Sequence, residues 1–121
     1  QMNEDAMATE KLAEGIRKRY SRLSREGFLG AARVRQERPG LVSVVGERLT
    51  MPVLVCIGED DPVRSASEVM ARQLPAARQL MFKATGHGIP SLRPEAYARE
   101  VLNFFDDLEG DTPIAGKRTV A

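Results

Sequence analysis

One short stretch constrains the fold of this chain more than any other. Residues 53–57, VLVCI, are consecutive apolar residues, and the acidic turn GEDD follows at 58–61. A run without polar alternation and rich in β-branched side chains is typical of a strand that is covered on both faces. Such strands belong to parallel sheets sandwiched between helices. Because ligands bind beyond the carboxyl ends of these strands, the acidic turn lies where chemistry is expected.

The only histidine of the chain, His87, lies 26 residues after Asp61. A helix and a second short strand are predicted between them. In a strand-helix-strand unit, both parallel strands end at the same edge of the sheet. We therefore expect Asp61 and His87 to meet at that edge.

Composition and charge limit the kinds of binding partner that are expected for this chain. A chain of 121 residues is one domain or part of one. Its 18 Lys and Arg balance 17 Asp and Glu, for a net charge of +1, so no electrostatic surface for nucleic acid is expected. No run of about 18 apolar residues exists, so neither a transmembrane helix nor a membrane partner is expected.

The single cysteine, Cys56, lies inside the first predicted strand. It is expected to be a small core residue rather than a reactive thiol. One cysteine forms no internal disulfide, which favours a reducing, cytoplasmic compartment. The opening residues QMNED carry no signal-peptide pattern, and a chain that opens on glutamine is expected to lack its true beginning.

Two helices are predicted before the strand. In the first, about residues 3–23, apolar side chains recur at steps of four and three, and basic side chains occupy the other faces. The second, residues 24–37, ends before Pro39. Residues 41–50 are predicted to be irregular.

The pattern after the acidic turn predicts a helix, a strand, a loop and a last helix. A capping box, SASE at 65–68, begins the first helix, which ends at Pro75. The strand is predicted at 79–83, the loop with His87 at 84–90, and the last helix at 94–110. Residues 111–121 lack periodicity and are predicted to be a flexible tail. The side chains expected to face inward are Ala66, Val69, Met70 and Leu74 in the first of these helices and Tyr97, Val101, Phe105 and Leu108 in the last.

Two strands joined by a helix make only a minimal parallel pair. The strand at 53–57 has the composition of a strand with neighbours on both sides, and alone it would be an exposed hydrophobic edge. We expect this chain to be the C-terminal part of a larger α/β sheet, with the other strands upstream of Gln1. The other interpretation is a free-standing chain whose sheet another polypeptide completes. The oligomeric state stays open, a homo-oligomer included.

Four segments, in this order, resemble the C-terminal third of an α/β-hydrolase-fold enzyme. They are MPVLVCIGEDDPV at 51–63, GHG at 86–88, RPEAY at 93–97 and VLNFF at 101–105. In that family a Gly-x-x-Asp turn after a strand supplies the triad acid, a later Gly-His loop supplies the general base, and a similar Arg-Pro-Glu sequence opens a terminal helix.

The resemblance implies the fold class and the domain organisation. The fold is expected to be α/β, the C-terminal portion of an α/β-hydrolase parallel sheet flanked by helices and preceded by cap-derived helices. Residues 1–39 are then the end of the helical cap, residues 40–110 belong to the hydrolase core, and residues 111–121 form the tail.

The same resemblance assigns roles to two residues. Asp61 matches the triad acid, because the Gly-x-x-Asp spacing counted from Gly58 falls on it, and His87 matches the general base. The carboxylate would accept a hydrogen bond from one imidazole nitrogen while the other nitrogen takes the proton of a nucleophile. Asp60 stays open as the alternative acid.

One departure from the family decides the expected activity. The nucleophile elbow, Gly-x-Ser-x-Gly, is absent from this sequence. We expect a serine hydrolase that acts on an ester, thioester, lactone or related bond of a small-molecule substrate. Its nucleophile would come from a missing N-terminal part of the same fold, so this chain alone is expected to be inactive. The alternative is a non-catalytic hydrolase-fold module that binds a ligand or partner.

Neither a cofactor nor a metal ion is expected. Attack, proton transfer and oxyanion stabilisation need only protein groups and water. One histidine, one cysteine within a strand and an acidic turn do not have the spacing of a zinc site. A Mg²⁺ pocket like that of phosphoacceptor domains would need a further Asp at the end of the next strand, where this chain has Lys83.

Overall fold

The computed structural model describes residues 4–121, which fall into two compact units with the boundary between Pro39 and Gly40. The first unit holds α1 (Glu4–Ser21) and α2 (Arg25–Glu37). The Oγ atom of Ser24 accepts a hydrogen bond from the Gly27 N–H at 3.0 Å and so caps α2. Apart from the half-buried Ala13, every side chain from residue 7 to residue 39 is exposed. The apolar side chains of these helices are therefore not buried within this unit.

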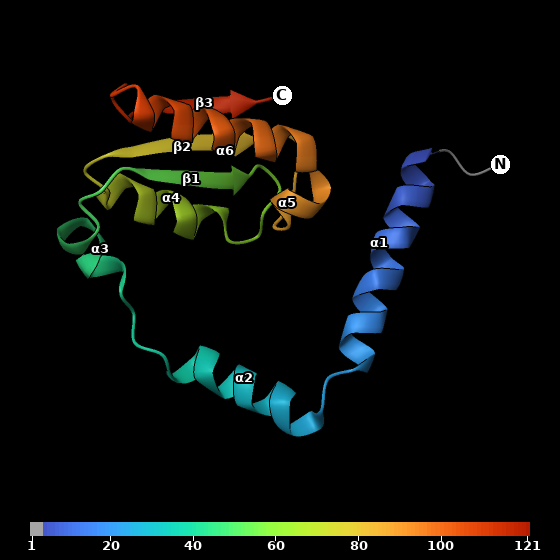
Figure 1. Cartoon of the computed structure of the whole chain (residues 1–121). Helices are drawn as coiled ribbons and strands as arrows, with labels where there is room; N and C mark the ends of the chain where they lie inside the picture. Colours follow the sequence, from blue (N-terminus) through green and yellow to red (C-terminus); the bar gives the residue numbers. More distant parts are fainter. Residues whose placement is uncertain (1–3) are drawn as a thin grey trace. The chain divides into compact units, whose positions relative to one another are not determined.

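The second unit is an α/β fold with a three-stranded parallel sheet in the order β1-β2-β3 and helices between the strands (Figure 1). Its elements are α3 (Val42–Arg48), β1 (Val53–Gly58), α4 (Arg64–Gln73), β2 (Ala77–Phe82), α5 (Ile89–Leu92), α6 (Pro94–Glu109) and β3 (Lys117–Val120). The predicted parallel pair is confirmed, with Val53 opposite Ala77 and Gly58 opposite Phe82.

Side chains alternate between the two faces of the sheet. On one face Leu80 and Phe82 are fully buried and pack with Ala96 of α6. On the other face Val55 and Ile57 pack with Ala71 of α4. Helices on both faces explain why the 53–57 run shows no polar alternation. Cys56, on the α6 face, is a half-buried packing residue as expected.

The prediction that residues 41–50 are irregular is wrong, because they contain α3. Val45 of this helix packs against the cluster on the α4 face of the sheet. A Cβ atom at Gly46 would lie 2.3 Å from the Gln73 carbonyl oxygen, so only glycine allows α3 to approach the end of α4 this closely. A seven-residue helix held by one packed valine leaves little periodicity in the sequence.

The prediction that residues 111–121 form a flexible tail is also wrong, because β3 extends the sheet. The Gln79 N–H donates to the Gly116 carbonyl and the Lys83 N–H donates to the Val120 carbonyl, each at 2.9 Å. Val120 is buried against the core on the α6 face. Its strand, KRTV, has a single large apolar residue. Pairing with β2 stabilises this segment, and the pattern of its own side chains does not reveal it.

The predicted capping box at 65–68 is wrong. α4 begins one residue earlier, at Arg64, and its N-cap Val63 offers no side-chain hydrogen bond. Glu68 instead accepts a hydrogen bond from Arg64 Nε at 3.1 Å, an i,i+4 ion pair.

The predicted inward faces of the two main helices are partly wrong. In α4 Ala71 is buried, as is Leu74 at the C-cap, while Val69 is 43% exposed. In α6 Phe104 is buried and Phe105 is 53% exposed. The inward face of α6 also holds a charged residue, Glu100, and a charged side chain is ordinarily assigned to the outer face.

Glu100 is buried because β3 supplies its partner. Its two carboxylate oxygens accept hydrogen bonds from the guanidinium of Arg118, one of them at 3.1 Å. Ala96, Glu100 and Phe104 are the buried residues of α6. Arg118, the partner of Glu100, belongs to β3, which the sequence pattern did not predict.

Candidate functional site

Asp61 lies in the turn that follows β1. Its backbone N–H donates to the Gly58 carbonyl at 3.2 Å, and its Oδ1 atom accepts a hydrogen bond from the Val63 N–H at 2.9 Å. These two bonds fix both the turn and the carboxylate. The Asp61 side chain is only 8% exposed, and its Oδ2 atom faces the loop that follows β2.

His87 lies in that loop, between the end of β2 and the start of α5. Its Nδ1 atom is 2.9 Å from Asp61 Oδ2, so the structure brings together the two residues that the sequence placed at one edge of the sheet. Since an ionised carboxylate accepts hydrogen bonds and donates none, Nδ1 carries the proton of this bond. The His87 side chain is 79% exposed, and Asp61 is its only side-chain partner within residues 4–121.

The electrostatics of the turn favour an ionised Asp61. The hydrogen bond from the Val63 N–H lowers the pKa of Asp61, and the bond and charge of His87 lower it further, against an opposing effect of burial. An ionised Asp61 holds the Nδ1–H tautomer of neutral His87. Nε2 is then left without a proton and able to accept one.

Asp60, the alternative acid, has a different environment. It is exposed, and its backbone N–H donates to the Thr85 carbonyl at 2.9 Å. His87 hydrogen-bonds to Asp61 and not to Asp60. Asp60 therefore joins the two loops through its main chain.

The two loops also touch at Gly58. A Cβ atom at this position would lie 2.3 Å from the Gly86 carbonyl oxygen and 2.4 Å from that of Thr85. Real Cβ atoms do not approach backbone oxygens this closely, so a larger residue would separate the acidic turn from the loop with His87.

Sequence reasoning missed three residues that support the loop. Glu59 accepts a hydrogen bond at Oε2 from the Ala84 N–H at 2.8 Å. Thr85 is buried and donates from Oγ1 to the Lys83 carbonyl at 2.8 Å. Arg93 donates to the same carbonyl at 3.1 Å and to Thr85 Oγ1 at 3.3 Å. Most of these partners are main-chain atoms, which a sequence pattern does not identify. The only sequence feature that could have pointed to one of the three residues is the Arg-Pro-Glu segment that begins at Arg93.

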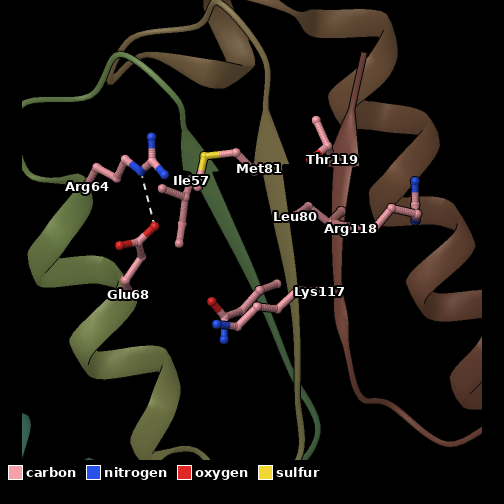
Figure 2. Close-up of a pocket in the computed structure, with 9 residues that line it drawn as sticks. Ile57, Arg64, Glu68, Leu80, Met81, Lys117, Arg118 and Thr119 are labelled. Carbon is pink, nitrogen blue, oxygen red and sulfur yellow. Dashed lines mark hydrogen bonds and ion pairs between the residues drawn. The ribbon is translucent and has the colours of Figure 1, made fainter.

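A groove of about 330 Å³ lies elsewhere, on the part of the sheet beside α4 (Figure 2). Figure 2 shows the ion pair of Arg64 and Glu68 on the left of the groove and Lys117 of β3 lower in the view. Neither Asp61 nor His87 lines this groove. The hydrogen-bonded pair, rather than the groove, is therefore the candidate functional site of the second unit.

The lone cysteine and the other possible metal ligands are the further candidate groups in the part of the chain that the structure describes. Burial, followed by the charge of Glu100, raises the pKa of Cys56 to about 11, which keeps the thiol protonated and unreactive at neutral pH. Within residues 4–121, no three His, Cys, Asp or Glu side chains are grouped to hold a metal ion. Across the same residues, no helix is both long and apolar enough to pass through a membrane.

No family model, curated protein or solved structure matches this chain.

Proposed function

We propose that this chain supplies the acid and the base of a serine-type hydrolase of the α/β-hydrolase fold. Asp61 is the acid and His87 is the general base. The observation that carries the proposal is the 2.9 Å contact between His87 Nδ1 and Asp61 Oδ2, beyond the carboxyl ends of two adjacent parallel strands. This is the position where open α/β sheets bind their ligands.

The geometry suits proton transfer during acyl transfer. With Nδ1 bonded to Asp61, Nε2 of the exposed His87 side chain accepts the proton of a serine hydroxyl as the serine oxygen attacks the carbonyl carbon of the substrate. Asp61 stabilises the imidazolium that forms. The same nitrogen then donates the proton to the leaving group when the tetrahedral intermediate collapses. The substrate class is an ester, thioester, lactone or related bond in a small molecule.

The nucleophile would come from polypeptide that pairs with β1. Within the described residues β1 is an edge strand, and its apolar sequence suits a strand with neighbours on both sides. A strand added there would bring its carboxyl end next to the acidic turn. Residues 4–39 are proposed to be the end of a cap. On this account the 121-residue chain alone has no turnover.

The test is hydrolysis of p-nitrophenyl acetate by the protein encoded by the complete reading frame. We expect Asp61→Asn to lower kcat by a factor on the order of 10⁴, because the amide no longer holds the reactive tautomer of His87. His87→Ala should have a comparable effect. Glu95→Ala is the control, since the side chain of Glu95 is exposed and makes no hydrogen bond to the other residues that the structure describes. Full activity in His87→Ala would overturn the role of His87 as general base. The absence of hydrolysis in the wild type would favour a ligand-binding or partner-binding module instead.

A further inference from the structure

The position of His87 depends on its loop more than on its own contacts. The ring is 79% exposed, and the bond to Asp61 is its one side-chain hydrogen bond within the described part of the chain. Most of the imidazole surface therefore faces solvent. The groups that fix the loop therefore determine where Nδ1 and Nε2 lie.

The loop turns sharply directly after β2. Ala84 has a φ of 49°, in the left-handed region that residues with a Cβ atom rarely adopt. Its N–H donates to Glu59 Oε2 at 2.8 Å. A hydrogen bond from a main-chain N–H to a carboxylate is charge-assisted and stronger than a neutral one. Glu59 thus stabilises the one residue of the loop whose backbone conformation is unfavourable.

Main-chain bonds from the same turn hold the loop on either side of Ala84. The Glu59 N–H donates to the Phe82 carbonyl and the Asp60 N–H donates to the Thr85 carbonyl, each at 2.9 Å. These bonds align the two segments but do not reach the backbone of Ala84. Among the residues of the acidic turn, the Glu59 side chain alone hydrogen-bonds to that backbone.

We propose that Glu59 is a positioning residue for His87: its carboxylate holds the turn at Ala84, and that turn aims the imidazole at Asp61. Only the predicted effect of Glu59 on turnover rests on the proposed function. The placement of the His87 ring is a property of the structure and is measured separately.

Several charged groups lie near Asp61, so the loss of the Glu59 charge must be separated from the loss of its hydrogen bond. Asp60 and Glu59 lie on its own turn, His87 faces it from the loop, and Arg64 of α4 donates to the Glu59 carbonyl at 3.4 Å. Replacing Glu59 by Ala or by Gln removes the same negative charge. Only Gln keeps an oxygen that can accept the Ala84 N–H. The difference between the two variants therefore isolates the hydrogen bond.

The experiment uses the single histidine of the chain as its own probe. Nitrogen NMR of the ring, at a pH where imidazole is neutral, reports the ratio of the Nδ1–H to the Nε2–H tautomer. We expect Glu59→Ala to lower this ratio by about fivefold, the equivalent of one ordinary hydrogen bond. Glu59→Gln and the control Glu95→Ala should keep the wild-type ratio. The amide spectrum of each variant verifies that it is folded.

Each outcome decides one question. An unchanged ratio in folded Glu59→Ala, or an equal loss in Glu59→Gln, overturns the positioning role. If the ratio falls only in Glu59→Ala, the role stands, and the protein from the complete reading frame should then lose kcat with little change in KM. A changed ratio in a protein without hydrolase activity would overturn the proposed function and leave the positioning role intact.

Discussion

At the scale of single residues, Asp61 is held by two bonds that act on different oxygens. The Val63 N–H bonds Oδ1 and His87 bonds Oδ2. The first is a local bond within the turn, whereas the second joins two segments that are distant in sequence. The bond from Val63 therefore holds the carboxylate in the turn independently of the loop with His87.

The lowered pKa of Asp61 gives a pH prediction. Its pKa in the folded chain should lie below the ordinary value of about 3.9, so its contribution to stability is complete above that value and is lost as the pH falls through the folded pKa. Carboxyl carbon NMR measures the midpoint. In His87→Ala the midpoint should rise only in part, because the hydrogen bond from the Val63 N–H, the largest single cause of the lowered pKa, remains. A midpoint at the ordinary value in the wild type would contradict the contacts of Asp61.

Gly58 gives a second residue-scale prediction. Gly58→Ala places a methyl group against the carbonyl oxygens of Gly86 and Thr85, and we expect it to destabilise the fold by about 1–3 kcal/mol. Urea unfolding measures the loss. Gly88→Ala is the matched control in the loop itself, because a Cβ atom there meets nothing within 4 Å. Equal stability of the two variants would show that the two loops do not touch as described.

At the scale of elements, β3 is attached to α6 by an ion pair whose two side chains differ in their exposure to solvent. The Glu100 side chain is 5% exposed, whereas Arg118 is 51% exposed. The hydrogen bonds from Arg118 lower the pKa of Glu100, against an opposing effect of burial. The two partners should therefore respond differently to mutation.

Arg118→Ala should destabilise the fold by about 2–3 kcal/mol, because it leaves a buried carboxylate without its partner. Glu100→Gln should cost about 1 kcal/mol or less, since the amide still accepts a hydrogen bond and Arg118 is half in water. Chemical unfolding at neutral pH compares the variants. The reverse order of stabilities would contradict the attachment of β3 to α6.

The elements also show what a sequence can and cannot predict here. The 53–57 run and the helix and strand after it were predictable, because their patterns follow from burial on both faces of a parallel sheet. The contact of Asp61 with His87 followed from this topology. β3 was not predictable, because its stability comes from hydrogen bonds to β2 and from one ion pair. The burial of Glu100 in α6 involves the same pair, and the proposed role of Glu59 involves a main-chain N–H.

At the scale of the whole molecule, the two units differ in burial. The first unit exposes nearly all of its described side chains, whereas the second buries a core on each face of its sheet. Helices without a buried face are marginally stable in water. The first unit should therefore open locally far more often than the second.

Limited proteolysis tests this difference. Trypsin should cleave first at the basic run in the first unit, which comprises Arg17, Lys18, Arg19, Arg22 and Arg25. A fragment that contains residues 40–121 should persist, and mass spectrometry identifies it. Cleavage at Arg78 of β2 or at Arg99 of α6 at the same rate would contradict the stability of the second unit.

The central claim is that Asp61 and His87 activate a serine from outside this sequence. The most direct measurement is the rate at which a fluorophosphonate labels the protein encoded by the complete reading frame. The account predicts that a single serine is labelled, and that His87→Ala slows the labelling by a factor on the order of 10³–10⁴, while Glu95→Ala does not. Labelling at the same rate in the wild type and in His87→Ala, or the absence of any labelled serine in the wild type, would contradict it.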